Sequence, residues 1–226
     1  MRTIDKPAGL PVLAPADNPR ADCLAARLIA EDPWRAKAGW PSGFTAGLAH
    51  RVDASTSGAI LVADTVDELT YLRAWLGEGR FVRTYVLQTA GPVPFEEAAC
   101  ELPLAWGRED RARMVVRTRS GLPHRGEWQP AVTRFRRLDA RRLVATVTTM
   151  AQHQIRAHAA HLGAPVLGDV LYGGEPLPDA SVGVAVPPGA TFLLHHVGMV
   201  GPAGLKTDRV AAPAWCADVR PWPPAG

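Results

Sequence analysis

The chain changes from polar to apolar within one short stretch, which reads His50-Arg51-Val52-Asp53-Ala54-Ser55-Thr56-Ser57-Gly58-Ala59-Ile60-Leu61-Val62-Ala63. The second half is apolar and β-prone, so it predicts a buried strand over 58–63. The first half is then a loop at the mouth of that strand, where proteins usually present reactive groups. Asp53 can act there as a nucleophile, a general base or a metal ligand. It can equally cap the amides of its own turn.

The pattern on either side of this stretch predicts further helices and strands. Thr65 to Glu68 form a capping box, in which Glu68 reaches back to the Thr65 amide and opens a helix that ends at Gly77 or Gly79. Other helices are predicted at 22–31 and at 152–162, and other strands at 82–89, 113–118, 131–136 and 143–149. Turns are expected at Ser120-Gly121 and Asp139-Ala140, loops at 5–11 and 33–47, and an irregular Pro-rich tail at 217–226.

The order of these segments predicts one α+β domain over residues 1–226. Strands outnumber helices and follow one another without regular crossover helices. That order favours a mixed, largely antiparallel sheet over a doubly wound one. A chain of 226 residues is long enough to bury roughly 70% of the surface that its unfolded form exposes.

Positive charge is concentrated in one segment. Residues 108–142 contain eleven arginines and four acids, a local balance of +7, whereas the whole chain carries +3. This asymmetry favours a surface that faces a polyanion such as nucleic acid. A solvated, arginine-rich face is the simpler alternative.

Other features bear on the compartment. No apolar run approaches the ~20 residues of a membrane span, and the first residues do not resemble a secretion signal. The cysteines Cys23, Cys100 and Cys216 are widely spaced without a C-x-x-C motif, so neither a disulfide framework nor a zinc site is predicted. We therefore expect a cytoplasmic protein with no membrane partner.

Three histidines, His153, His158 and His161, lie close together in sequence. His153 and His158 are separated by roughly 140° around a helix, and only His158 and His161 share a face. No H-E-x-x-H arrangement is present, so helix histidines without metal are favoured over a metal site. Arg156 is more informative, because an arginine beside an apolar stripe at a helix start can reach into a cleft and hold an anion.

Two further segments have a structural and a functional interpretation. Arg83 and Tyr85 share one face of the strand predicted at 82–89, where a cation and a ring could hold a planar base. A core tyrosine is the simpler interpretation. The segment Gly168–Gly174 is typical of a turn with a structural role.

Five motifs occur in a fixed order: Asp5-Lys6-Pro7-Ala8-Gly9-Leu10, the stretch His50–Gly58, Arg83-Thr84-Tyr85, His153-Gln154-Ile155-Arg156-Ala157-His158 and Gly168-Asp169-Val170-Leu171-Tyr172-Gly173. In this order they resemble the RluA-type pseudouridine synthases, whose pattern reads K-P-x-G, H-R-L-D-x-x-T-S-G, K/R-x-Y, H-Q-I-R-x-H and G-D-x-x-Y-G. The resemblance runs from about residue 4 to at least 200. It implies a bent sheet flanked by helices, an active-site cleft across the sheet, and isomerisation of uridines in ribosomal or transfer RNA.

The resemblance also implies a role for individual residues. Asp53 is the catalytic carboxylate, Arg156 is its partner, and Tyr85 stacks on the uracil. Arg51 fills the stack that the flipped uridine leaves, and the flipping itself costs a few kcal/mol. Further substrate contacts are expected from His50, Thr56, Arg83 and Gln154, and contacts to the RNA backbone from Arg111, Arg113, Arg117 and Arg119. The family uses neither metal nor cofactor, and we expect a monomer.

The chain departs from the family pattern in three places. Val52 replaces leucine, Arg83 stands where lysine is frequent, and Ala151 stands where the family has arginine. The last change puts a phosphate or loop contact in doubt and keeps open a catalytically inactive RNA-binding protein of the same fold. An unrelated aspartate hydrolase or histidine–metal enzyme lacks its companion motifs. No S4-like domain precedes the first motif, so the arginine-rich segment 108–142 is expected to supply RNA binding.

Overall fold

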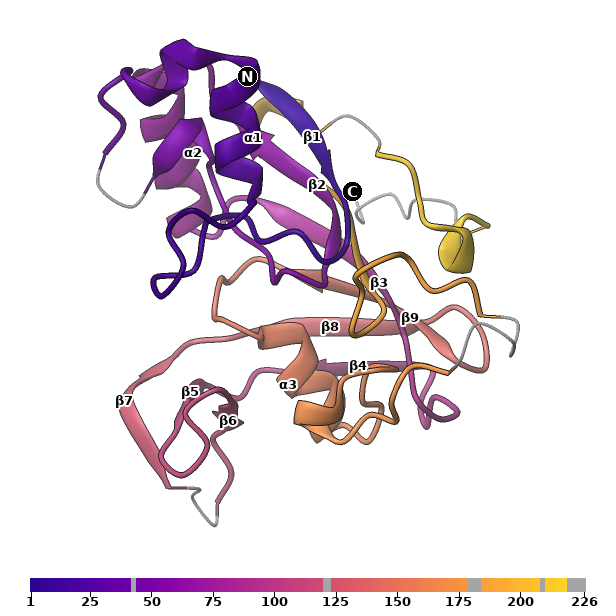
Figure 1. Cartoon of the computed structure of the whole chain (residues 1–226). Helices are drawn as coiled ribbons and strands as arrows, with labels where there is room; N and C mark the ends of the chain where they lie inside the picture. The colour runs from indigo at the N-terminus through magenta and orange to yellow at the C-terminus, as the bar shows by residue number, and fades with distance from the viewer. Residues whose placement is uncertain (42–43, 120–122, 179–183, 208–209, 219–226) are drawn as a thin grey trace.

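The computed structural model describes residues 1–41, 44–119, 123–178, 184–207 and 210–218. In this part of the chain the main element is a seven-stranded sheet of order β1-β2-β10-β3-β9-β8-β4 (Figure 1). Its strands are β1 (Arg2–Lys6), β2 (Ser57–Val62), β3 (Val82–Gln88), β4 (Glu97–Cys100), β8 (Thr133–Arg137), β9 (Arg142–Val147) and β10 (Leu194–Val200). Neighbouring strands are antiparallel except β2 and β10, which are parallel. The predicted mixed, largely antiparallel sheet is therefore confirmed.

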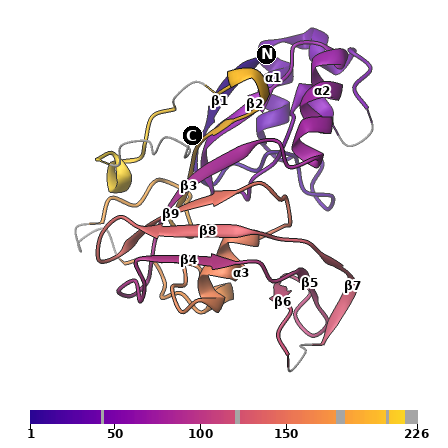
Figure 2. The same ribbon diagram turned by 180° about the vertical axis from the view of Figure 1, so that it is seen from behind.

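A second, smaller sheet extends from the main one, as Figures 1 and 2 show. It has the order β6-β5-β7, with β5 at Leu104–Gly107, β6 at Met114–Val116 and β7 at His124–Gln129. Nearly every side chain of β7 is exposed. This small sheet carries part of the arginine-rich segment.

Helices cover both faces of the main sheet. They are α1 (Leu24–Glu31), α2 (Val66–Gly77) and α3 (Gln154–His161). Successive residues of β2 point to opposite faces, so Ile60 packs with α1 whereas Leu61 packs with α2. Helix α3 packs on β3 and β9 in the core cluster that contains Tyr85. Val52 touches the clusters of both α1 and α3, which places these two helices on one face of the sheet.

Most of the predicted elements are confirmed, with shifted boundaries. The helix predicted at 152–162 begins at Gln154, because His153 has a left-handed backbone with φ 53°. The carboxylate of Glu68 accepts a hydrogen bond from the Asp64 amide, not from the Thr65 amide as predicted, while the Thr65 hydroxyl caps the helix as expected. Short 3-10 turns occupy parts of 33–47. Ser120-Gly121 and residues 219–226 of the tail lie outside the described residues.

Five strands escaped prediction, and each lacks a clear alternation of apolar and polar residues. Strand β1 takes in the start of the loop expected at 5–11, because Asp5 and Lys6 complete its pairing with β2. Strand β10 contains two histidines and a bulge between His196 and Gly198. Strands β4 and β5 have four residues each, and β7 is almost fully exposed. Their pairing partners, and not their own sequences, make these segments strands.

Candidate active site

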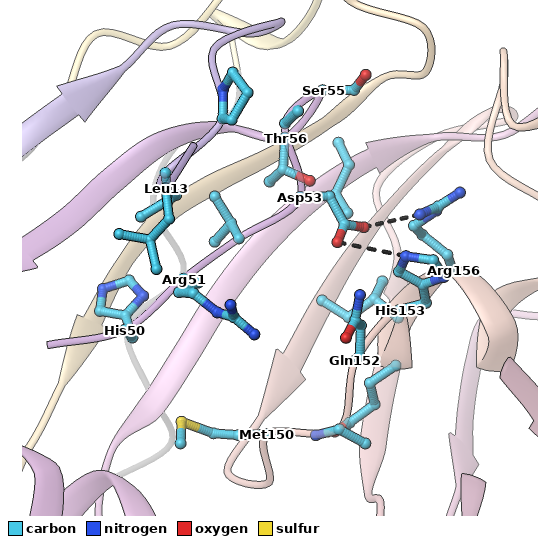
Figure 3. A pocket seen from close by; sticks show the side chains of 18 of the residues that line it. Leu13, His50, Arg51, Asp53, Ser55, Thr56, Met150, Gln152, His153 and Arg156 are labelled. Atoms are coloured by element: carbon cyan, nitrogen blue, oxygen red, sulfur yellow. Dashed lines mark hydrogen bonds and ion pairs between the residues drawn. The ribbon is translucent and has the colours of Figure 1, made fainter. Parts of the chain in front are cut away.

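A pocket of about 1140 Å³ opens on the face of the main sheet that carries Tyr85. Its walls come from the loop 11–16, the strand mouth 50–56, strands β3 and β9, and the start of α3. Figure 3 shows Asp53, His153 and Arg156 grouped in this pocket, with Arg51 reaching into it. The volume is slightly above the upper end of the range that small-molecule sites occupy, about 300–1,000 Å³.

Packing and hydrogen bonds hold the loop that carries Asp53. Val52 is wedged between two core clusters, and the Thr56 amide donates to the Asp53 carbonyl at 3.0 Å. The Lys6 ammonium is fully buried and donates to the Ala54 carbonyl at 2.8 Å. Lys6 from the first motif therefore ties the start of the chain to the residue after Asp53.

Lys6 also donates to the carbonyls of Pro7 and Leu10, at 2.8 and 2.7 Å. Burial lowers the pKa of the Lys6 ammonium to about 8, and the nearby charge of Asp53 opposes that change. Three carbonyl acceptors around one ammonium explain why this position takes lysine. Charge alone did not identify Lys6 as part of the site; the K-P-x-G motif was the available signal.

Gly58 allows strand β2 to approach β10. Its φ is +111°, and a Cβ at this position would lie 2.1 Å from the carbonyl oxygen of His196. Any larger residue would push the two strands apart. Gly58 thus fixes the distance between the loop of Asp53 and the strand beneath the pocket.

Arg156 joins two carboxylates that are far apart in sequence. Its Nη1 donates to Oδ2 of Asp53 at 2.9 Å, and its Nε and Nη2 donate to Asp169 at 2.6 and 2.8 Å. Asp169 is almost fully buried, so this bidentate pair fixes the guanidinium. The guanidinium also lies over the rings of Phe192 and Tyr172, at 4.3 and 5.0 Å.

Electrostatics favour a charged Arg156. Burial alone would lower the pKa of Arg156, but its hydrogen bond with Asp169 and the charge of Asp53 outweigh burial and raise it. The predicted pairing of Arg156 with Asp53 is found in the structure. The segment 168–174, for which a structural turn was the first interpretation, also contributes to the site, because Asp169 orients Arg156. The G-D-x-x-Y-G motif was the signal for this residue.

Arg83 and Tyr85 point to the same face of β3, as predicted, and both line the pocket. The Tyr85 ring stacks on His196, with centroids 4.4 Å apart and planes 23° apart. Burial raises the pKa of Tyr85, so its hydroxyl stays protonated at neutral pH. Arg83 is buried and donates from Nη2 to the Thr149 carbonyl.

The rim of the pocket is positively charged. Arg51 is exposed and lines the pocket together with Arg73, which lies 3.7 Å over the ring of Phe44. Burial and the nearby Arg51 lower the pKa of Arg73. Arg73 was not predicted, because it lies on the helix α2 in a segment without a motif.

Gln154 lines the pocket, but its amide is fully engaged by the protein. Its Oε1 accepts from the Thr149 hydroxyl and the Ala151 amide. Its Nε2 donates to the Val132 carbonyl and the Thr133 hydroxyl. Both donors are thus used within the protein, where Gln154 holds the backbone of 149–151 in place, and its contact with substrate stays a prediction.

His50 and Thr56, for which substrate contacts were predicted, are both buried. His50 is 3% exposed, and its Nε2 accepts from the Leu61 amide at 3.1 Å. Thr56 is 1% exposed. Both line the pocket, and the Thr56 amide holds the loop of Asp53 through its hydrogen bond to the Asp53 carbonyl.

The four predicted RNA-backbone arginines, Arg111, Arg113, Arg117 and Arg119, flank β6 on the small sheet and are exposed. Arg113 lies 5.4 Å from the Tyr172 ring and Arg117 lies 5.8 Å from the Trp128 ring. Trp106, which was not predicted, lines the pocket with the guanidinium of Arg125 over it at 5.3 Å. The small sheet therefore continues the positive, aromatic surface away from Asp53.

No group of three histidine, cysteine or acidic side chains in the described ranges is arranged to hold a metal ion. His158 is buried and bonded to Thr133 and to the Leu102 carbonyl, whereas His161 is exposed. The helix histidines therefore occupy separate environments. No helix of the described part is long and apolar enough to cross a membrane.

Buried histidines beneath the pocket predict acid sensitivity. Burial lowers the pKa of His195 to about 4 and of His196 to about 3. Between about pH 6.5 and 4 these two imidazoles become protonated in the unfolded chain but stay neutral in the folded protein. The free energy of unfolding should therefore decrease as the pH is lowered from about 6.5 to 4. The decrease is about 1.4 kcal/mol per pH unit for each such histidine.

Urea denaturation at pH 7.0, 5.5 and 4.5 tests this expectation. His195→Gln should flatten the pH dependence, and His161→Gln should not, because His161 is exposed. Identical slopes for wild type and His195→Gln would contradict the assignment of a neutral, buried imidazole.

Comparison with known proteins adds a family model described as RNA pseudouridylate synthase, which matches residues 2–161. Ribosomal large subunit pseudouridine synthase D of Xanthomonas campestris is 34% identical over 195 residues, which are 84% of this chain and 52% of the relative. The protein of the same name from Escherichia coli K12 is 32% identical over 184 residues, covering 77% and 50%. The chain thus spans about half the length of these curated relatives.

Two solved human structures share the fold. RNA Pseudouridylate Synthase Domain Containing 1 has a TM-score of 0.65 and 21% identity, covering 93% of this chain and 79% of that one. RNA Pseudouridylate Synthase Domain Containing 4 has a TM-score of 0.64 and 23% identity, covering 95% and 86%.

Proposed function

The chain belongs to the RNA pseudouridylate synthase family, and we propose that it isomerises uridine to pseudouridine in RNA with Asp53 as the reacting carboxylate. The observation that carries this proposal is the ion pair of Asp53 with Arg156 inside a large open pocket. The whole reaction is an isomerisation. The bond from C1′ to N1 breaks, a bond from C1′ to C5 forms, and the proton of C5 is replaced by one on N1.

The residues around Asp53 fit the needs of this reaction. Arg156 fixes the direction of the carboxylate through a charge-assisted hydrogen bond to Oδ2. Tyr85 presents its ring to the pocket with His196 behind it, so a uracil that enters can stack on a supported surface. Asp53 then attacks the sugar or base, or removes a sugar proton, and both routes need the same oriented carboxylate.

Reaching a uridine inside folded RNA requires that the base be flipped out of its stack, at a cost of a few kcal/mol. Arg51 is exposed at the rim of the pocket and carries a flat cation. We assign it the role of filling the vacated stack, because a guanidinium stacks well on bases. Arg73 beside it adds positive charge that attracts the RNA backbone.

Ribosomal RNA is the substrate class to test first, because the curated relatives are named for the large ribosomal subunit. Transfer RNA is the second class. Ala151 lines the pocket, and its backbone amide donates to Oε1 of Gln154. The ion pair of Asp53 with Arg156 is present with alanine at this position, which supports an active enzyme over an inactive RNA-binding protein.

Pseudouridine mapping of total RNA from cells with and without the gene tests activity and target together. We expect at least one site to disappear with the gene and to return when purified protein is added to the unmodified RNA. A chain that binds RNA but converts no uridine in either ribosomal or transfer RNA would contradict the proposal.

The arginines of the small sheet should contribute to RNA affinity. Replacing Arg111, Arg117 and Arg119 together by glutamine is expected to weaken binding and to make its salt dependence shallower by about 2 in log–log slope, because fewer counterions are released. Filter binding between 50 and 300 mM salt measures the slope. A matched variant replaces three exposed arginines outside the segment 108–142 by glutamine, at Arg20, Arg27 and Arg80. Equal salt slopes for the two variants would contradict the RNA-binding role and favour the simpler alternative, a solvated arginine-rich face.

A further inference from the structure

His153 occupies a constrained position beside Asp53. Its backbone is left-handed, a conformation that residues other than glycine adopt rarely and that asparagine, aspartate and histidine tolerate best. Such outliers concentrate where a side chain must point in one direction. In Figure 3 the imidazole faces Asp53, and its Nε2 lies 3.7 Å from Oδ1 of that carboxylate.

The other ring nitrogen of His153 contacts Tyr172. Its Nδ1 lies 3.0 Å from the Tyr172 hydroxyl, which accepts a hydrogen bond from the Met114 amide at 2.9 Å. Burial raises the pKa of Tyr172, so this hydroxyl keeps its proton. Among the described residues, Nδ1 is the acceptor within reach of that proton. The hydrogen-bond network therefore assigns the ring proton of His153 to Nε2, on the side of Asp53.

We propose that His153 is a positioning residue that donates from Nε2 to Oδ1 of Asp53, while Arg156 holds Oδ2. Donors on both oxygens fix the rotation of the carboxylate, which a single contact leaves free. The separation of 3.7 Å is longer than a hydrogen bond, and such contacts commonly tighten when substrate fills a site. The role rests on the proposed function, because the carboxylate that it orients is the one proposed to react.

Two aromatic rings restrict the imidazole. Trp106 meets it edge-on with centroids 6.1 Å apart, and Tyr172 does so at 5.8 Å. The side chain is 12% exposed, so little room remains for another rotamer. The ring is therefore ordered before substrate arrives, as a positioning group must be.

Two substitutions distinguish the loss of the Nε2 donor of His153 from a disturbance of the fold. His153→Asn keeps the left-handed turn and can still accept the Tyr172 proton, but its side chain ends near the position of Nδ1 and does not reach Asp53. His153→Gln extends to the position of Nε2 and restores a donor. We expect His153→Asn to lower kcat by about 10²-fold with KM within about threefold, and His153→Gln to recover about tenfold of that loss. The control is the same change at exposed His161, which should retain activity.

A second measurement needs no substrate. Long-range ¹H–¹⁵N spectra of the full chain report which ring nitrogen carries the proton. We expect the Nε2–H form in the wild type, and a shift toward Nδ1–H in Tyr172→Phe, which removes the hydroxyl that donates to Nδ1. This spectrum is independent of the reaction.

The outcomes are distinguishable. Equal kcat for wild type and His153→Asn, or an Nδ1–H imidazole in the wild type, overturns the positioning role. A general loss of folding would lower the activity of His153→Asn and His153→Gln alike, so recovery in the glutamine variant alone supports the role. A wild-type protein that converts no uridine but carries the Nε2–H form contradicts the proposed function and leaves the geometry of His153 supported.

Discussion

Asp53→Asn is expected to abolish pseudouridine formation, with a loss of at least about 10³-fold, and to leave RNA binding intact. Asparagine has the shape of aspartate, and its amide oxygen can still accept from Nη1 of Arg156. Arg156 also keeps its bidentate pair with Asp169, so the fold does not depend on the charge at position 53. What the variant lacks is the negative oxygen that reacts.

The measurement compares tritium release from C5-labelled RNA with binding of the same RNA. Asp67→Asn, the same substitution at an exposed position of α2, is the matched control and should behave as wild type. Turnover by Asp53→Asn within tenfold of wild type would remove this carboxylate from the mechanism. Loss of RNA binding in the variant would show that the charge serves the fold and would contradict the reasoning above.

Arg156→Lys is expected to have the second largest effect, lowering activity by at least about 10²-fold. Arg156 uses three nitrogens on two carboxylates, and a lysine ammonium offers one point charge in their place. The variant cannot hold Asp53 and Asp169 at once. Because Asp169 is buried, removing its partner altogether in Arg156→Ala should cost about 3–5 kcal/mol of stability.

Arg35 provides a matched control for this substitution. It is also a buried arginine, paired with Asp32 and Asp64, but it lies outside the pocket. Arg35→Lys should lower the midpoint of urea denaturation with the activity of the folded fraction unchanged. Arg156→Lys should lower kcat even at temperatures where it is fully folded. A near-normal kcat for Arg156→Lys would show that Arg156 has a structural role only.

The sequence anticipated the elements whose signal is local. Strand β2 is an apolar run, and α2 begins at a capping residue and ends at glycine, so short-range rules sufficed for both. Strands β7 and β10 were missed because one is exposed along its length and the other contains histidines and a bulge. Such segments become strands through a partner that lies far away in the chain.

The candidate site shows the same division. Arg83 and Tyr85 share a face through the period of a strand, and this follows from the sequence. The burial of His50, Thr56 and Gln154 does not follow from the sequence, since motif position alone does not tell whether a polar group is already bonded within the protein. That question is decided by neighbours from distant segments.

The sequence by itself determined the class of fold, the family motifs and the aspartate on which the proposed chemistry depends. Only the tertiary structure decided how that aspartate is held, by Lys6 behind its loop and by Arg156, which is paired with Asp169. It also placed the imidazole of His153 between Asp53 and Tyr172, at 3.7 and 3.0 Å. The physical reason is that hydrogen bonds act over about 3 Å, whereas these groups are separated by up to 166 positions along the chain. Folding removes that separation, and only then does each carboxylate acquire its donors.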